Sequence, residues 1–289
     1  MTTDIQTVTV LGTGVLGSQI AYQAAYCGHR VTAYDITEEA LDAGRRRFRA
    51  LVSRYEREVA GAADGRAQSA VARIRCSSDL ADAARDADLV IEAAPEILQL
   101  KRDLYQKLAR IAPEKTIFVT NSSTLLPSDL AASTGRPDRF LALHFANEIW
   151  IRNIAEIMGH PGTDPAVYET VVEFARSIGM EPIELKKEQP GYVLNSLTVP
   201  FLFAALDLLV KDVADPATID KTWRIATGAP AGPFQMLDVI GLNTVYNIAV
   251  ASPDETVQAA AKYLKERYLD RGKLGQASGE GFYRYPVTA

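Results

Sequence analysis

The chain has 289 residues, of which 47% are hydrophobic and 23% charged, a composition that excludes a disordered, collagen-like or coiled-coil protein. Its 31 lysine and arginine residues against 36 aspartate and glutamate residues give a formal net charge of −5, so no overall positive charge attracts it to nucleic acid or an anionic membrane. This length suits one large domain or two ordinary ones, and we expect two.

The cysteines and the apolar segments bear on the compartment. Cys27 and Cys76 have no CxxC spacing and are too few for a disulfide framework, which favours a reducing cytoplasm and predicts no metal site. The longest apolar run, 193–210, contains Asn195 and Asp207 and is too polar to span a bilayer. The first residues enter a strand pattern at once, which leaves no room for a signal peptide. We therefore expect a cytoplasmic protein without membrane or nucleic-acid partners.

The N-terminal segment has the pattern of a nucleotide-binding strand, turn and helix. A β-branched strand at 8–11 leads into a G-x-G-x-x-G turn, and apolar residues then recur at helical spacing. The first glycine makes the turn, the second lets the backbone approach a pyrophosphate, and the third lets the helix pack on the strand. The residues of this predicted phosphate-binding turn are Gly12, Thr13, Gly14, Val15, Leu16 and Gly17.

Asp35 ends the second predicted strand, at 31–34, where an acidic side chain can accept hydrogen bonds from both ribose hydroxyls of a dinucleotide. A 2′-phosphate at this position would meet a like charge, and the following Ile36 and Thr37 supply no arginine to relieve it. The sequence therefore favours NAD over NADP as the cofactor. The alternative is a doubly wound sheet that binds some other anion.

Residues 37–74 form a charged, helix-favouring stretch that is longer than a usual crossover helix. We predict a helical hairpin that turns near 61–65. Its first half carries a basic cluster, consisting of Arg45, Arg46, Arg47, Arg49 and Arg54. This cluster either grips a phosphate-bearing ligand or forms a solvated helix face, and a solvated face is the more common arrangement.

Strands and helices then alternate, which implies a parallel sheet whose ligands bind beyond the carboxyl ends of the strands. Strands are predicted at 89–92, 116–119 and 140–144, and a helix at 96–111. The polar residues that follow these strands are Glu96, Asn121, Ser122, Ser123 and His144. No G-x-S-x-G sequence occurs, so we interpret the two serines as hydrogen-bond donors or turn residues and not as nucleophiles.

His144 is the predicted acid/base residue because His29 and His160 occupy predicted surface positions, whereas His144 ends a buried strand. Glu156 follows in a strand-like run and can meet His144 only if the chain reverses between them, for which the polar segment 147–153 is suitable. A carboxylate beside the imidazole would orient it and stabilise its charged form. The alternative is a core histidine bonded to the backbone.

Helical patterns replace strand patterns from Gly191 onward, so we place a domain boundary near 189–191. The segment 193–209 is apolar nearly all round, which predicts burial in the core or in a subunit interface. Asn195 stands out within it, because a buried amide needs partners in the protein or in a ligand.

Together these motifs resemble the L-3-hydroxyacyl-CoA dehydrogenase family over nearly the whole chain. The likeness is greatest to its bacterial 3-hydroxybutyryl-CoA dehydrogenase and diketoreductase branch, through 143–147, 186–195 and 275–285. The resemblance implies a Rossmann-type, mostly parallel α/β domain over 1–189 with the helical hairpin as an insertion. It also implies an all-α substrate and dimerisation domain over 190–289.

The resemblance also implies the site. NAD would be bound by Gly12, Gly14, Val15, Leu16, Gly17, Asp35, Glu96, Lys101, Ser123 and Asn147. The catalytic set would be His144, Glu156, Ser123 and Asn195. Neutral His144 would take the hydroxyl proton as hydride leaves to NAD, and protonated His144 would return it in reduction. The implied activity interconverts 3-hydroxyacyl-CoA and 3-ketoacyl-CoA.

Three departures concern the substrate. Glu148 stands where the family usually has proline, Leu51 and Glu58 stand where better-known members contact CoA, and Ala277 replaces a lysine. Arg47 and Arg54 share the face of Leu51 and could substitute. One alternative is therefore a reductase of CoA-free 3-keto acids or esters. Another is a non-catalytic NAD-binding protein, against which the intact acid/base residues argue.

Overall fold

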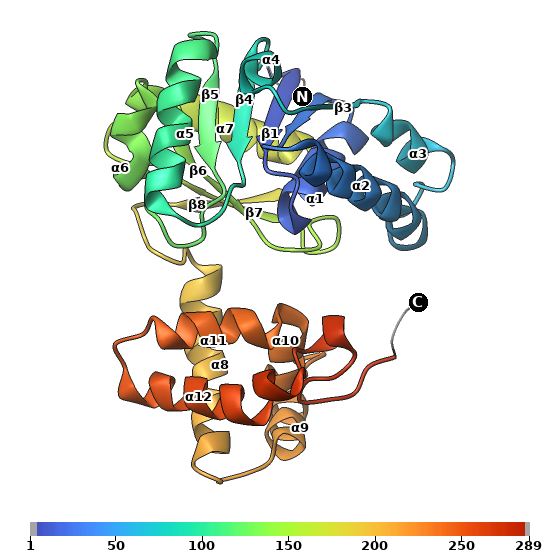
Figure 1. The fold of residues 1–289 in the computed structure, drawn as a ribbon, viewed down its shortest axis with the longest axis vertical. Helices are drawn as coiled ribbons and strands as arrows, with labels where there is room; N and C mark the ends of the chain where they lie inside the picture. The colour runs from blue at the N-terminus through green and yellow to red at the C-terminus, as the bar shows by residue number, and fades with distance from the viewer. Residues whose placement is uncertain (1–4, 287–289) are drawn as a thin grey trace. The chain divides into compact units, whose positions relative to one another are not determined.

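The structure of the protein is a computed structural model that describes residues 5–286. The chain divides into two compact units, of which the first ends at Val193 and the second begins at Leu194. Figure 1 shows that strands and helices alternate in the first unit and that helices make up the second. The sequence placed this division near 189–191.

The described part of the first unit contains a sheet of eight strands in the order β3-β2-β1-β4-β5-β6-β7-β8. The strands are β1 Thr7–Leu11, β2 Arg30–Tyr34, β3 Ile74–Ser77, β4 Leu89–Glu92, β5 Ile117–Thr120, β6 Phe140–Phe145, β7 Ile154–Met158 and β8 Glu181–Leu185. Neighbouring strands are parallel except β6 and β7, which are antiparallel. The predicted doubly wound, mostly parallel sheet is confirmed.

Helices cover both faces of this sheet (Figure 1). The helices of the unit are α1 Val15–Tyr26, α2 Glu38–Glu58, α3 Arg66–Val71, α4 Leu80–Ala84, α5 Leu98–Ile111, α6 Pro127–Leu130 and α7 Pro165–Ser177, with 3-10 turns η1 Ala131–Thr134 and η2 Pro137–Arg139. Helices α2 and α3 form the predicted hairpin. Thr37 caps α2 by accepting a hydrogen bond from the Ala40 amide at 3.2 Å.

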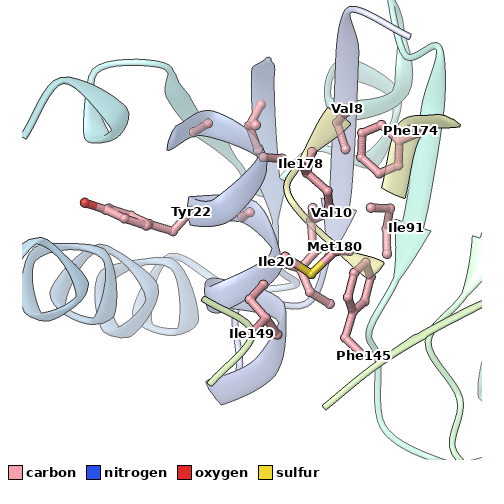
Figure 2. Packing of buried hydrophobic residues seen from close by; sticks show 14 of the residues in the cluster. Val8, Val10, Ile20, Tyr22, Ile91, Phe145, Ile149, Phe174, Ile178 and Met180 are labelled. Atoms are coloured by element: carbon pink, nitrogen blue, oxygen red, sulfur yellow. The ribbon is translucent and has the colours of Figure 1, made fainter. Parts of the chain in front are cut away.

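Two hydrophobic cores result from the alternation of side chains along the strands. Along β4, Leu89 and Ile91 belong to the core that contains residues of α1 and α7, whereas Val90 belongs to the core that contains residues of α5. Figure 2 shows the first of these cores, where Phe174 of α7 packs near Val8 and Ile91. Both faces of the central strands are therefore buried, as expected for a parallel sheet.

Two strands and one histidine of this unit differ from the sequence analysis. The edge strands β3 and β8 were not predicted, because neither contains an uninterrupted apolar run. His29 is 8% exposed and not a surface residue: its Nε2 lies 3.2 Å from Ser177 Oγ and its ring packs on Phe174. Burial also lowers the pKa of His29.

The described part of the second unit is helical, as predicted. Its elements are α8 Leu194–Val210, α9 Pro216–Thr227, α10 Pro233–Ile240, α11 Leu242–Val250 and α12 Glu255–Arg267, with 3-10 turns η3 Leu269–Arg271 and η4 Gln276–Ser278. Buried Asp238 holds the C-terminal segment, because its carboxylate accepts hydrogen bonds from the amides of Phe282 and Tyr283 at 2.8 and 2.9 Å. A Cβ on Gly281 would lie 2.0 Å from Asp238 Oδ1, so only glycine fits there.

Helix α8 is less buried within its unit than its apolar sequence predicts. Leu202 and Leu206 belong to the core of the unit, but Leu197 is 70% exposed and Leu208 is 40% exposed. Asn195 lies in the first turn and is partly exposed. Among the helices of residues 5–286, none combines the length and hydropathy that a bilayer span requires.

Candidate active site

The glycine-rich turn after β1 requires glycine at two positions. Gly12 has a φ of 101°, and a Cβ there would lie 2.6 Å from the carbonyl oxygen of Ala93. A Cβ on Gly17 would lie 2.0 Å from the carbonyl oxygen of Gly12, so the third glycine lets α1 approach the turn. Beside Gly14, apart from its own neighbours along the chain, no described atom lies within 4 Å of the Cβ position. This open side, at the N-terminus of a 12-residue helix, fits a pyrophosphate.

Asp35 lies beside this turn. Its Oδ2 accepts hydrogen bonds from the backbone amide and the hydroxyl of Thr13, at 2.8 and 2.7 Å, and its Oδ1 accepts one from the Ile36 amide at 2.9 Å. Each carboxylate oxygen can accept more than one hydrogen bond. The carboxylate is therefore held in place and can still bind the hydroxyls of a ribose, so the turn and Asp35 together fit NAD.

The antiparallel hairpin of β6 and β7 brings His144 and Glu156 together. The two residues are direct partners in the β6–β7 register, and His144 Nδ1 lies 3.0 Å from Glu156 Oε2. The chain reversal on which their meeting depends is present. An ionised carboxylate only accepts hydrogen bonds, so it places the imidazole proton on Nδ1 and leaves Nε2 as the atom that can take up a proton.

The surroundings of His144 fix its ring. His144 and Glu156 are 4% and 1% exposed. Nε2 lies 3.0 Å from Ser123 Oγ, and the ring of Tyr192 stacks on the imidazole at a centroid distance of 4.4 Å. Glu156 Oε1 accepts a hydrogen bond from the Val193 amide at 2.9 Å, so both carboxylate oxygens have partners. The arrangement suits a base and its orienting group, next to a hydroxyl donor.

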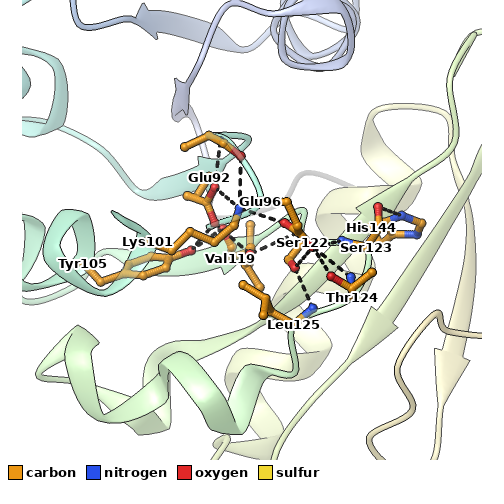
Figure 3. A network of polar contacts seen from close by, with 12 residues as sticks. Glu92, Glu96, Lys101, Tyr105, Val119, Ser122, Ser123, Thr124, Leu125 and His144 are labelled. Carbon is orange, nitrogen blue, oxygen red and sulfur yellow. Dashed lines mark hydrogen bonds and ion pairs between the residues drawn. The ribbon is translucent and has the colours of Figure 1, made fainter. Parts of the chain in front are cut away.

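Glu96 accepts hydrogen bonds from the 122–124 turn, which contains Ser123 (Figure 3). Its Oε1 accepts hydrogen bonds from the amides of Ser123 and Thr124 at 3.0 and 2.9 Å, and from the hydroxyls of Ser122 and Thr124. Burial raises the pKa of Glu96, but the hydrogen bond from Ser122 and the Lys101 ammonium outweigh it, so the pKa lies below its ordinary value. Glu96 is therefore a carboxylate at neutral pH.

The other predicted site residues lie in different surroundings. Lys101 is 1% exposed, and its Nζ lies near Glu92, Glu96 and the carbonyl of Ala94. Asn147 is exposed, just beyond β6. Asn195 belongs to the second unit, in α8. Thus the first unit brings together five of the predicted site residues: His144, Glu156, Ser123, Glu96 and Lys101. They lie where β4, β5 and β6 end, on the side of the sheet where the glycine turn and Asp35 follow β1 and β2.

Two residues of this region escaped the sequence analysis. Glu92 is fully buried beneath Lys101, and its signal was a charge at the end of the apolar run Leu-Val-Ile. Tyr192, which stacks on His144 and donates a hydrogen bond to the Ser122 carbonyl at 2.8 Å, follows Gly191 in a segment without strand or helix periodicity. No periodic pattern distinguishes such a residue. Among residues 5–286, no group of three metal-binding side chains is close enough to hold an ion.

Comparisons with known proteins agree with this geometry. Residues 7–189 match the family model of the 3-hydroxyacyl-CoA dehydrogenase NAD-binding domain, and residues 191–285 match that of its C-terminal domain. The mitochondrial hydroxyacyl-coenzyme A dehydrogenase of Rattus norvegicus is 34% identical, with 97% of this chain and 91% of the relative covered. A probable 3-hydroxybutyryl-CoA dehydrogenase of Bacillus subtilis is 32% identical, with 98% of both chains covered.

A solved diketoreductase, described in connection with catalysis on dicarbonyl compounds, is 65% identical. It superposes with a TM-score of 0.94, and 99% of this chain and 100% of that chain are covered. The matched domains and the full-length relatives show that the chain belongs to the 3-hydroxyacyl-CoA dehydrogenase family, a family of NAD-dependent oxidoreductases.

Proposed function

We propose that this protein interconverts 3-hydroxyacyl-CoA and 3-ketoacyl-CoA, with His144 as the general acid and base and Glu156 as its orienting partner. The observation that carries the proposal is the buried His144 imidazole, with Glu156 at Nδ1 and the Ser123 hydroxyl at Nε2. In oxidation Nε2 takes the proton of the substrate hydroxyl, and in reduction it returns that proton to the forming alkoxide. Ser123 and Asn195 would position the substrate oxygen.

When bound, NAD supplies the acceptor for the hydride, and NADH supplies its donor. The glycine turn Gly12–Gly17 would bind the pyrophosphate through Val15, Leu16 and neighbouring amides, and Asp35 would bind the ribose. Glu96 and Asn147 would complete the cofactor site. Lys101 would contribute through Glu96, because its ammonium lies between Glu96 and Glu92 in the structure.

A second candidate function is reduction of CoA-free 3-keto acids or esters. Leu51 is 6% exposed and belongs to the core of the first unit, so it is not available to a ligand. The Arg54 guanidinium donates hydrogen bonds to Glu58 and Glu148, at 3.1 and 2.9 Å, and its charge is already paired. Arg47 donates to the Thr13 carbonyl. The arginines that could replace the usual CoA contacts therefore have other partners, and the diketoreductase relative supports the same candidate.

An NADH oxidation assay with acetoacetyl-CoA and with ethyl acetoacetate tests both functions. Because remote binding to CoA is weakened here, we expect turnover of both substrates, with an advantage for the thioester in kcat/KM below about 10⁴. Turnover of the thioester alone would reject the second candidate. Turnover of neither, with NADH still bound, would support the non-catalytic alternative and contradict the proposal.

Removing the two carboxylates that pair with Arg54 tests whether this arginine can bind the phosphates of CoA. Glu58→Gln with Glu148→Gln frees the guanidinium, so we expect KM for acetoacetyl-CoA to fall by about 3- to 10-fold, the scale of exposed ion pairs. KM for the ester should not change, since the ester has no phosphates. Glu56→Gln, an exposed residue of the same helix, is the matched control. Equal responses of both substrates would show that α2 does not contact CoA.

We also propose that the protein is a cytoplasmic homodimer joined by the helices of its second unit. The exposed apolar side chains Leu197, Ile225 and Ile248 support an interface, and both free cysteines support a reducing compartment. Light scattering should give twice the chain mass of 31.5 kDa. Leu197→Lys should shift the mass toward the monomer, whereas the control Lys262→Glu on exposed α12 surface should not. A wild-type monomer would contradict the proposal.

A further inference from the structure

Glu92 is a buried carboxylate for which the proposed reaction has no direct use. It ends β4, is fully buried, and accepts four hydrogen bonds (Figure 3). Lys101 Nζ and the Ala94 amide donate to Oε1 at 2.6 and 2.7 Å, and the Thr120 and Tyr105 hydroxyls donate to Oε2 at 2.8 and 3.4 Å. Burying a carboxylate and an ammonium is costly even when they are paired, so this pair is weak evidence of stabilisation.

The Lys101 ammonium contacts three oxygen atoms inside the first unit. Its Nζ donates hydrogen bonds to Glu92 Oε1 at 2.6 Å and to the Ala94 carbonyl at 3.1 Å, and it forms an ion pair with Glu96 Oε2 at 3.3 Å. Lys101 therefore links the fully buried Glu92 to Glu96.

Glu96 connects Lys101 to the turn that contacts the His144 imidazole. Its other oxygen holds the turn 122–124, and in that turn Ser123 Oγ lies 3.0 Å from His144 Nε2. A parallel connection runs through the backbone, since the Asn121 amide donates to the Glu92 carbonyl at 2.8 Å and Asn121 Oδ1 accepts from the Phe145 amide at 3.0 Å. Figure 3 shows the side-chain sequence from Glu92 through Lys101 and Glu96 to Ser123 and His144.

We propose that Glu92 and Lys101 are positioning residues that fix Glu96 and, through it, the Ser123 hydroxyl against His144 Nε2. The pair does not touch the reacting atoms. Without Glu92, the ammonium would be drawn toward Glu96 alone, and the carboxylate would leave the 122–124 turn. The inference rests on the proposed function for its catalytic consequence, but the predicted change at His144 holds whatever the substrate is.

The test compares Glu92→Gln, Lys101→Met and the double variant with the wild type. The first readout is the ¹⁵N chemical shift of His144 Nε2 in histidine-labelled protein, assigned by its loss in His144→Gln. The second is kcat and KM with the ester, and the third is Tm. We expect the Nε2 signal to move in all three variants, and kcat to fall by about 10- to 100-fold with KM changed less than about 3-fold, the range of a mispositioned acid/base group.

The double variant separates positioning from stability. Each single variant breaks the buried Glu92–Lys101 ion pair and should lower Tm, whereas the double variant removes both charges and should regain much of the lost Tm. We expect its kcat and Nε2 signal to remain altered. If both return to wild-type values together with Tm, or if Glu92→Gln leaves the Nε2 signal unchanged, the inference is wrong. The Nε2 signal is measured on the protein without cofactor or substrate, so its outcome is distinct from failure of the wild type to oxidise NADH, which would contradict the proposed function.

Asp88→Asn is the matched control. Asp88 precedes β4, at the opposite end of the strand from Glu92, and accepts hydrogen bonds from the amides of Gln6 and Thr7 at 3.0 and 2.9 Å and from Lys115. Its pKa is held low by these hydrogen bonds and the Lys115 charge, against the effect of burial. The substitution should lower Tm and leave the Nε2 signal and kcat unchanged. An equal response of Asp88→Asn and Glu92→Gln in the Nε2 signal would contradict a specific link.

Discussion

His144→Gln is expected to lower kcat for a 3-keto substrate by about 10² to 10⁴-fold, the usual share of general acid/base catalysis. Glutamine is similar in size but cannot exchange a proton at neutral pH. Its amide can still meet Ser123 and Glu156, so the surrounding hydrogen bonds are kept. Binding of NADH, followed by its fluorescence, should persist because the glycine turn and Asp35 are not altered. Full turnover would show that His144 is a core histidine.

Glu156→Gln keeps the shape and the acceptor for the Val193 amide, but removes the charge that favours an imidazolium. It should lower kcat less than His144→Gln does. The double variant should be little worse than His144→Gln alone, because an orienting group has no effect once the imidazole is gone. Losses that add in the double variant would mean that the two residues act separately. The measurement is kcat of the wild type, the two single variants and the double variant with one 3-keto ester.

The features predicted from sequence are those whose cause is local. The glycine turn needs a positive φ at Gly12 and close backbone approach at Gly12 and Gly17, which only glycine allows, so the spacing can be recognised in the sequence. The apolar runs of the central strands, such as 89–92, are equally direct because both faces are buried. The meeting of His144 and Glu156 needed a further assumption, a reversal between two short runs, which the polar segment supported.

The features missed depend on contacts that the local sequence does not encode. Edge strand β8, with glutamate at 181 and 184, pairs with a neighbour on one side only and lacks an apolar pattern. His29 is buried because α7, far along the chain, covers it. Leu51 reads as a helix-face residue until its packing in the core is seen. Likewise, no spacing rule indicates that buried Lys101 donates to Glu92 and the Ala94 carbonyl and pairs with Glu96.

The second large effect concerns the cofactor: NADH should be preferred over NADPH by about 10² or more in kcat/KM. A 2′-phosphate would face the Asp35 carboxylate, and like charges in close contact cost several kcal/mol. The structure sharpens the argument, because Thr13 donates two hydrogen bonds to Asp35 Oδ2 and the Ile36 amide donates one to Oδ1. The carboxylate is thus unable to turn away from the phosphate without breaking them.

Replacing Asp35 by Ser together with Ile36 by Arg should lower the ratio of kcat/KM for NADH to kcat/KM for NADPH. Ile36 is 77% exposed, so an arginine there can extend beside Asp35's position without displacing core residues. Thr13→Val is the matched control: it removes one anchor of the carboxylate but keeps its charge, so the preference for NADH should persist even if KM for both cofactors rises. Steady-state kinetics with both cofactors measure the ratio. Equal kcat/KM of the wild type with NADH and NADPH would show that Asp35 does not bind the ribose. A fixed carboxylate there would accept hydrogen bonds from the ribose hydroxyls and repel a 2′-phosphate.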